Sequence, residues 1–317
     1  MAQHAWLLHC LSTGSLHRIN IGEPKTVFTR IDHVTIAVAD LASAIDTYTR
    51  LGFNIHEGGG HPGKGTHNAL AFNQDDYLEL IAVADRAEYL AASATGGLID
   101  FVEQGGGLRH IAVQSDDLAS DVVAMRARGV DIGDVVDGTR RTPGGLDLRW
   151  RAAVLGASHA LPLLFIEHVT PLAARRTQVA GAGGHPNGVA RIDRVYVAVT
   201  DVAAAAATCA QVLGMATPHI ERGNVVKADM AVFNLGPSGF TVAQPAEPGP
   251  AADAMTRRGA GPFQVLLRTT GMAAAARWME THGLAPPARG VRNTGEEAML
   301  VPPHDACGAY VGLVGPA

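Results

Sequence analysis

Two nearly identical lines of the sequence differ at a residue that could do chemistry. Residues 30–40 read RIDHVTIAVAD and residues 191–201 read RIDRVYVAVTD, so that seven of the eleven letters agree. The first copy contains His33, whose imidazole can bind a metal ion or transfer a proton near neutral pH, whereas the second copy has Arg194. Asp32 and Asp193 are the same in both copies, and we interpret Asp32 as a scaffold residue rather than a site residue.

Two carboxylates stand in apolar stretches that have the character of β-strands. Glu79 lies in YLEL and Glu167 in FIEH. Burying a carboxylate between apolar neighbours is costly unless the group is paired or bound to a metal. Strand alternation places Glu79 on the same face as Tyr77. Ion pairs with Arg109 or Arg149 are the alternative to a metal.

The elements that position these residues repeat four times along the chain. Each unit starts with a short alternating strand, continues with a segment of helical spacing that ends at a glycine, and then has three strand-like pieces. In the first unit, Asp40 is the expected helix cap and Gly52 the expected stop. The unit is therefore β-α-β-β-β, and self-similarity of this kind predicts a repeat architecture.

Length and composition predict two domains, and the β-α-β-β-β units predict the α+β class. The 317 residues exceed one average domain, and 47% of them are hydrophobic, which is enough for two cores. We expect an N-terminal extension over residues 1–27, one pair of units over 28–172, a Gly-rich linker over 173–189 and a second pair over 190–317.

Charge and cysteine content exclude several classes of protein. The net charge is −5 and basic residues form no run, so we expect no nucleic-acid partner. No apolar stretch reaches the length of about 18 residues that a membrane span needs. The three cysteines are far apart and show no metal-binding spacing, which favours a reduced cytoplasm.

The repeat resembles the vicinal oxygen chelate superfamily, which includes glyoxalase I, methylmalonyl-CoA epimerase, extradiol dioxygenases and fosfomycin-resistance proteins. The resemblance is carried by DHVTIAV at one strand start and YLELI at a later strand. HPGKGTHNALAF followed by DDYLELIAV is similar to the glyoxalase-like branch. The resemblance covers nearly the whole chain from residue 28 and implies four βαβββ modules paired into two glyoxalase-like domains.

The resemblance also implies a metal site in the first domain. The positions that correspond to superfamily ligands hold His33, Glu79, His110 and Glu167, a mixed set that suits one divalent ion of Ni, Co, Zn, Mn or Fe. The expected counterparts in the second domain are Arg194, about Val242, Gln264 and about Gly312, none of which is a usual ligand. We therefore expect a degenerate second domain without a metal. A structural, hydrogen-bonded histidine is the alternative for each imidazole.

Further residues near the expected site could bind a substrate. His61, Lys64, His67 and Asn68 lie in GHPGKGTHNAL, and Tyr77 precedes Glu79 by two residues. Each histidine could move a proton, and Lys64 and Asn68 could meet an anionic or carbonyl group. Hydrogen bonding within the loop is the alternative for both histidines.

The implied activity is metal-assisted proton transfer, of isomerase or lyase type, on a small oxygenated metabolite. Glu79, Glu167 and His67 are the expected catalytic groups. An Fe(II) extradiol-type dioxygenase using His33, His110 and Glu167 is the first alternative, and a non-catalytic, drug-sequestering binding protein is the second. A small-molecule substrate and a homodimer are the expected partners.

Overall fold

The computed structural model describes residues 28–93, 97–159, 161–179 and 184–316. The predicted extension over residues 1–27 and the cysteine at position 10 lie outside these residues. No helix in the described part is long and apolar enough to cross a membrane.

The first half of the chain forms a closed eight-stranded barrel in the order β1-β4-β3-β2-β6-β7-β8-β5. Its strands are β1 (Ile31–Ala37), β2 (His56–His61), β3 (Thr66–Phe72), β4 (Tyr77–Val83), β5 (Gly107–Gln114), β6 (Val136–Arg141), β7 (Asp147–Val154) and β8 (Leu163–His168). Its helices are α1 (Leu41–Arg50), α2 (Arg86–Ala92), α3 (Gly97–Glu103) and α4 (Leu118–Ala127), with a 3-10 turn η1 (Ala157–His159).

The second half forms a curled eight-stranded sheet in the order β10-β11-β12-β9-β13-β16-β15-β14. Its strands are β9 (Val189–Ala198), β10 (Ile220–Gly223), β11 (Ala228–Leu235), β12 (Ser238–Pro245), β13 (Gly261–Thr269), β14 (Ala288–Val291), β15 (Glu297–Val301) and β16 (Tyr310–Val314). Its helices are α6 (Val202–Leu213), α7 (Pro250–Arg258) and α8 (Met272–Thr281), with a 3-10 turn η3 (Pro303–Asp305). The expected α+β fold of paired glyoxalase-like domains is confirmed.

The local signals that predicted the first helix act as expected. The Asp40 side chain accepts a hydrogen bond from the Ser43 backbone N–H at 2.7 Å and caps α1. Gly52 follows the helix with a φ of +91°, a conformation that favours glycine. Leu41, Ala44 and Tyr48 form the buried face of the helix, as the spacing of apolar residues predicts.

The segment predicted as a linker contains regular structure at its start, and its residues 180–183 lie outside the described residues. Helix α5 (Leu172–Arg175) and the 3-10 turn η2 (Arg176–Val179) begin the segment that was predicted as a linker. His185 and Asn187 near its end are buried. Both ends contact the first half, because Arg175 lines the first barrel and the Asn187 Nδ2 donates to the Leu51 carbonyl at 3.0 Å.

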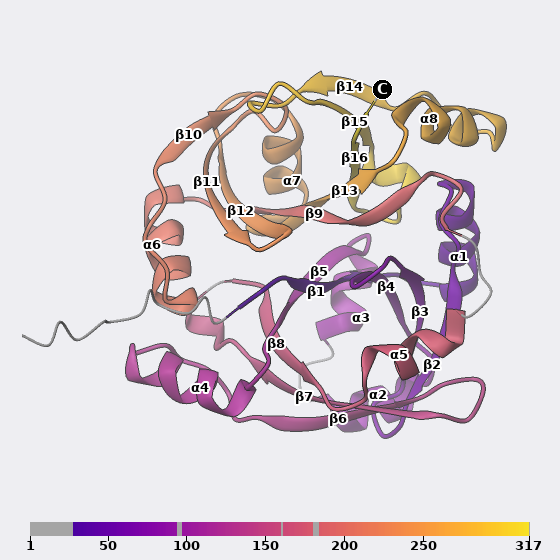
Figure 1. Cartoon of the computed structure of the whole chain (residues 1–317), viewed down its shortest axis with the longest axis vertical. Coiled ribbons are helices and arrows are strands. Elements are labelled where there is room, and N and C mark those ends of the chain that lie inside the picture. The colour runs from indigo at the N-terminus through magenta and orange to yellow at the C-terminus, as the bar shows by residue number, and fades with distance from the viewer. Residues whose placement is uncertain (1–27, 94–96, 160, 180–183, 317) are drawn as a thin grey trace, which may run out of the picture.

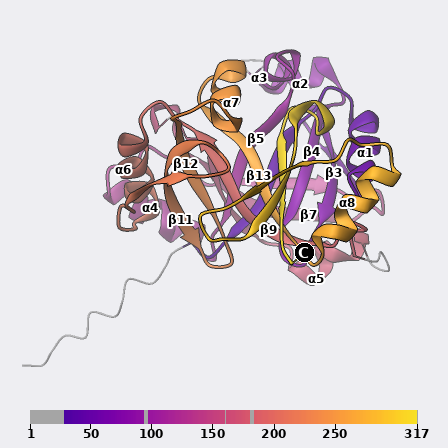
Figure 2. The same ribbon diagram turned by 90° about the horizontal axis from the view of Figure 1, so that it is seen from above.

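The two sheets lie one above the other and share a core (Figures 1 and 2). Helices α1 and α8 lie side by side at one end, where the Trp278 indole N–H donates to the Thr49 carbonyl at 3.4 Å. Helices α4 and α6 meet at the other end. The shared core contains Val34 and Ile36 from the first half and Val195 and Val197 from the second.

The halves also bind each other's opening strands in a reciprocal way. The Ile31 backbone N–H at the start of β1 donates to Ser238 Oγ of the β11–β12 turn at 2.8 Å. The Ile192 backbone N–H of β9 donates to the Asp76 carboxylate of the β3–β4 turn, at 3.1 Å to each oxygen. We call these two contacts the reciprocal clasp. It fixes the first barrel against the second sheet.

Candidate functional site

The first barrel encloses a cavity of about 410 Å³. Alternate residues of the strands point into it, because successive side chains of a strand face opposite sides. The lining includes His33 and Thr35 from β1, Asn68 from β3, Tyr77 and Glu79 from β4, His110 from β5, Arg140 from β6, Trp150 from β7 and His168 from β8. Three of the four expected metal ligands therefore face one space.

His33 is held in place by a buried carboxylate. Its Nδ1 lies 2.8 Å from Asp32 Oδ2, and the other Asp32 oxygen lies 2.9 Å from His168 Nε2. Burial raises the pKa of Asp32, but the bonds and charges of His168 and His33 outweigh burial and hold it well below its usual range. Asp32 therefore joins two imidazoles as an ionised acceptor and leaves His33 Nε2 directed at the cavity.

Glu79 is the buried carboxylate of the cavity. Thr35 Oγ1 donates to its Oε2 at 3.1 Å, and Asn68 Nδ2 donates to its Oε1 at 2.6 Å. Burial raises the pKa of Glu79, but the imidazoles of His33 and His61 and these hydrogen bonds bring it below its ordinary value. Glu79 is therefore an anion at neutral pH, available as a ligand or a base.

Two further imidazoles of the cavity are neutral near pH 7. Burial lowers the pKa of His110 to about 4, with a smaller contribution from the charge of Arg109. Burial also lowers the pKa of His61, whose Nε2 lies 4.0 Å from Glu79 Oε1. Neutral imidazoles can coordinate a metal or accept a proton.

The imidazoles and the carboxylate of the cavity are the types of ligand that a divalent ion binds, but too few of them lie close enough together to hold one. His33 Nε2 lies 3.7 Å from Glu79 Oε2, and two ligands of one ion stand about 3–4 Å apart. Within the described ranges, however, no three His, Cys, Asp or Glu side chains form a group that could hold a metal ion. His33 and Glu79 fit such an ion, and a third protein ligand is not in place.

The structure does not bring Glu167 into this group. Glu167 lies on the outer face of β8, where its Oε2 accepts the Leu118 backbone N–H at 3.1 Å at the start of α4. Its Oε1 lies 3.5 Å from Arg151 Nη1. His168, the next residue, faces the cavity instead. Strand alternation puts Glu167 on the face of Phe165, and that face belongs to the core and not to the cavity.

His67 is also outside the cavity. On β3 the lining residues are Thr66, Asn68 and Leu70, so that His67 points to the opposite face, where its charge acts on Asp40. The expected catalytic and substrate-binding role of His67 has no support from this position. The other candidates His61, Lys64, Asn68 and Tyr77 all line the cavity.

Sequence reasoning missed several residues of the cavity. His168 was passed over in favour of its neighbour, and Asp32 was set aside because it has a counterpart in the second half. Arg140 and Arg175 are 6% and 5% exposed and line the cavity. Their signal was weak, because an arginine in a polar stretch is normally a surface residue.

The strand register corrects one counterpart in the second half. Thr35 of β1 faces Glu79 of β4. The residue of β9 that corresponds to Thr35 is Tyr196, and it faces Thr241 of β12. The counterpart of Glu79 is therefore Thr241, and the expected Val242 is wrong by one residue.

A second counterpart is corrected in the same way. Val265 faces Val311 between β13 and β16, as Ile111 faces Leu163 between β5 and β8. Counting along the strands makes Gly315 the counterpart of Glu167, in place of the expected Gly312. The four positions thus hold Arg194, Thr241, Gln264 and Gly315, and none of these is an imidazole or a carboxylate.

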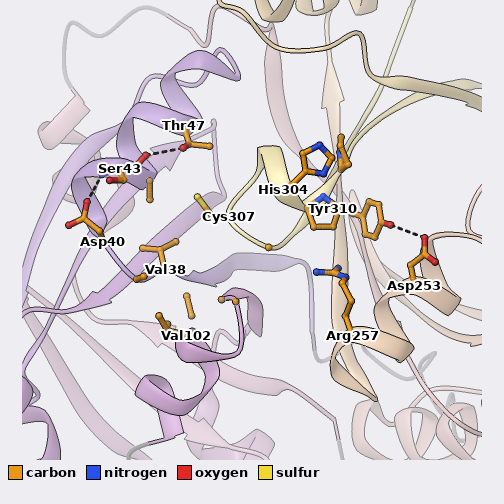
Figure 3. A pocket seen from close by; sticks show the side chains of 18 of the residues that line it. Val38, Asp40, Ser43, Thr47, Val102, Asp253, Arg257, His304, Cys307 and Tyr310 are labelled. Atoms are coloured by element: carbon orange, nitrogen blue, oxygen red, sulfur yellow. Dashed lines mark hydrogen bonds between the residues drawn. The ribbon is translucent and has the colours of Figure 1, made fainter.

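A larger groove lies between the halves, and none of the predicted metal-binding, catalytic or substrate-binding residues line it. Its volume is about 960 Å³, and Figure 3 shows the side chains that line it. The first half contributes Val38, Asp40, Ser43, Thr47 and Val102, and the second contributes Asp253, Arg257, His304, Cys307 and Tyr310. The Tyr310 hydroxyl donates to Asp253 Oδ2 at 3.3 Å across one wall.

Comparison with known proteins agrees with this architecture. The model of the glyoxalase-like domain family matches residues 31–213, which is more than half of the chain. The chain therefore belongs to the glyoxalase-like domain family. A search of the curated proteins found no match.

Solved structures show the same fold at low sequence identity. A hypothetical protein from Staphylococcus aureus is 14% identical with a TM-score of 0.62, over 90% of this chain and 99% of that one. A mutant of 4-hydroxymandelate synthase from Streptomyces coelicolor is 14% identical with a TM-score of 0.60, over 91% and 92%. A xylose isomerase-like TIM barrel/4-hydroxyphenylpyruvate dioxygenase fusion protein is 13% identical with a TM-score of 0.55, over 92% and 49%.

Proposed function

We propose that the first barrel is the active site of an enzyme that moves a proton next to a carbonyl group of a small oxygenated metabolite. The observation that carries the proposal is Glu79, a buried anion in an enclosed cavity. Thr35 and Asn68 hold its two oxygens, and His33 and His61 flank it. A general base needs this combination of ionisation and fixed orientation.

Each neighbour of Glu79 has a part in the proposed reaction. Glu79 takes the proton from the carbon next to the carbonyl. His61, which is neutral and 4.0 Å from Glu79, is the group that passes the proton on. Asn68 donates to Glu79 Oε1 through its Nδ2 and thereby fixes the orientation of the base.

A divalent ion fits beside Glu79 in this proposal. His33 and Glu79 would hold it, and His110 is the lining residue that would complete the protein ligands. Such an ion supplies a Lewis acid that stabilises the charge developing on a substrate oxygen. Ion analysis after reconstitution with Fe, Ni, Mn and Zn tests this part: about one ion per chain, lost in His33→Ala, is expected. Protein that binds none of the four contradicts it.

Deuterium exchange tests the proton transfer. Small 2-hydroxy ketones and 2-oxo acids are incubated with the protein in D₂O, and loss of the α-proton is followed by NMR. Exchange should fall by about 100-fold or more in Glu79→Gln, since the base is lost. Glu167→Gln is the matched control and should retain exchange, because Glu167 lies outside the cavity. No exchange in the wild type over the whole panel contradicts the proposal.

Dioxygenase chemistry is the second candidate. The cavity offers two imidazoles and one carboxylate, His33, His110 and Glu79, which is the composition of a facial triad for Fe(II). The likeness to 4-hydroxymandelate synthase supports the fold alone at 14% identity. Oxygen uptake by the Fe(II)-loaded protein with catechols favours this candidate, and proton exchange without oxygen uptake favours the first. Binding of the same compounds with neither reaction favours a sequestering protein.

A further inference from the structure

We propose that a second cavity, between the two halves, binds a small amphipathic anion, whose carboxylate or phosphate bonds to Arg258 and whose apolar body lies against a wall of leucines. We call this space the arginine cavity, and its volume is about 340 Å³. It is separate from the first-barrel cavity, because the two share only His110 and Val154 among the described residues that line them. The inference therefore goes beyond the proposed function and does not depend on it.

Arg258, the last residue of α7, has buried hydrogen-bond donors without an acceptor. Its Nη1 and Nη2 atoms are buried and have no hydrogen-bond partner among the described residues. Burial lowers the pKa of Arg258, and the like charge of Arg257 lowers it further. Leaving a buried donor unpaired is costly, most of all in a charged group. An oxygen of a ligand in the cavity would be the missing acceptor.

The contacts that Arg258 does make leave these donors unpaired. Its guanidinium carbon lies 4.5 Å from the centroid of the Phe101 ring. A ring face stabilises a cation, but it is a weak acceptor of N–H hydrogen bonds. Arg258 also stands in the last turn of α7, where the helix dipole favours a positive charge. Neither effect supplies an acceptor for Nη1 and Nη2.

No carboxylate of the described residues lines the arginine cavity. The lining contains Arg109, Arg257 and Arg258 and neither aspartate nor glutamate. Arg257 has a carboxylate nearby, because it lies 5.9 Å from the ring centroid of Tyr310, whose hydroxyl donates to Asp253. The inference therefore rests on the other two arginines.

Arg109 brings a second positive charge to the same aromatic ring. Its guanidinium carbon lies 5.0 Å from the Phe101 centroid, and its Nη1 donates to the uncharged Gly97 carbonyl at 2.9 Å. Burial lowers the pKa of Arg109, and no carboxylate is among the groups that shift the pKa of Arg109 or Arg258. An anion in the cavity would reduce the electrostatic cost of placing both charges at one ring.

The rest of the cavity is apolar, which specifies the body of the ligand. Its wall includes Leu108, Leu155, Leu163 and Phe263, each of which is at most 5% exposed. The planar fork of arginine matches the oxygens of a carboxylate or a phosphate. A cationic end beside an apolar wall therefore fits an anion that carries a hydrocarbon chain better than it fits an inorganic ion.

Four probes test the inference on the wild type by isothermal titration calorimetry. Hexanoate and hexyl phosphate have both the charge and the chain, hexan-1-ol has the chain alone, and acetate has the charge alone. At least one amphipathic anion should bind about tenfold or more tightly than hexan-1-ol, because a hydrogen bond to a charged group is the stronger one. It should exceed acetate by about tenfold or more as well, because acetate has no chain to bury.

The tighter of the two amphipathic anions identifies the charged group as a carboxylate or a phosphate. Hexan-1-ol or acetate binding as tightly as both of these anions would overturn the proposal, and so would the absence of binding by both.

Variants locate the anion in the arginine cavity. Arg258→Gln should weaken the preferred anion by about tenfold to 100-fold and leave hexan-1-ol unchanged, because it removes the charge and one of the two Nη donor groups. Arg109→Gln should weaken it less, since Arg109 also bonds to Gly97. Arg277→Gln removes an exposed arginine of α8, changes the net charge equally and should change nothing. Undiminished binding in Arg258→Gln would mean that the anion binds elsewhere, against the proposal.

This inference and the proposed function can fail separately. Glu79 lines the first-barrel cavity and not the arginine cavity. Glu79→Gln should therefore lose proton exchange and bind the preferred anion as tightly as the wild type. The comparison of the four probes needs no variant, so it still decides the matter if Arg258→Gln does not fold.

Discussion

Asp32 shows how one residue can serve both the fold and the site. It is fully buried, and its two oxygens meet His33 at 2.8 Å and His168 at 2.9 Å. Its counterpart Asp193 meets Arg268 at 2.9 Å and Arg292 at 3.4 Å. The carboxylate therefore accepts hydrogen bonds in both halves, from imidazoles in the first half and from guanidinium groups in the second. In the first half it orients an imidazole that faces the cavity.

Replacing Asp32 tests this positioning role. Asp32→Asn should weaken the binding of Ni²⁺ or Mn²⁺ by about tenfold to 100-fold, because a hydrogen-bonded carboxylate fixes the tautomer and the orientation of a ligating imidazole. Titration calorimetry of the folded variant measures the change. Asp193→Asn is the control and should have the ion affinity of the wild type. An equal loss in both variants would indicate a general effect on folding instead.

The order of the elements along each unit and the limits of the first helix could be predicted from the sequence, because they depend on local signals. Period-two alternation, the Asp40 cap and the stop at Gly52 each act within a few residues. The orientation of β8 could not be predicted in this way. Leu164 and Ile166 face the cavity, whereas Leu163 and Phe165 face the core, so both faces are apolar. Which face meets the cavity depends on the closure of the barrel.

The orientation of β8 predicts different effects for two adjacent residues. Glu167→Gln should leave ion binding unchanged and lower the free energy of unfolding by about 0.5–1.5 kcal/mol, because its bond to the Leu118 N–H at the start of α4 is weakened. His168→Ala should weaken ion binding, because it removes a partner of Asp32. Urea unfolding and calorimetry measure the two effects. If Glu167→Gln lost more ion affinity than His168→Ala, Glu167 and not His168 would be the residue of β8 that faces the cavity.

At the scale of the whole molecule, the two halves depend on a shared core and a bonded connection. The shared core includes β-strand residues of both halves. His185, near the end of the connection, accepts the Asn54 backbone N–H at its Nδ1 at 3.0 Å, and its Nε2 lies 3.2 Å from Asn73 Oδ1. Accepting at Nδ1 requires a neutral ring. Burial accordingly lowers the pKa of His185 to about 4.

This neutral histidine makes stability depend on pH. The pKa of His185 is about 4 in the folded protein and about 6.5 in the unfolded chain, so the unfolded chain binds more protons between pH 4 and pH 6.5. His185 therefore contributes stability above about pH 6.5, and this contribution is lost as the pH falls towards 4. The difference in free energy of unfolding between wild type and His185→Gln should therefore shrink by about 2 kcal/mol from pH 7 to pH 5.

Comparing the wild type with His185→Gln also removes the effect of Asp76, which changes the stability with pH in the opposite direction. Burial raises the pKa of Asp76 to about 6, so that this group lowers stability as the pH rises from about 4 to 6. Asp76 is present in both proteins, and its effect cancels in the difference. Urea unfolding at pH 5, 6 and 7 provides the measurement. A difference that stays constant with pH would show that His185 is not held neutral.

The reciprocal clasp has a consequence for which residues of the second half can be substituted. Each half supplies the acceptor for the other half's first strand, through Ser238 and Asp76. The second half has Arg194, Thr241 and Gln264 at the positions of His33, Glu79 and His110, and it still makes a contact that the first half needs. Deleting it would leave the Ile31 N–H without its acceptor and expose the shared apolar core to water. We therefore expect substitutions to be tolerated at the positions that correspond to His33, Glu79 and His110, and to be restrained at Ser238 and Asp76, where each half holds the first strand of the other.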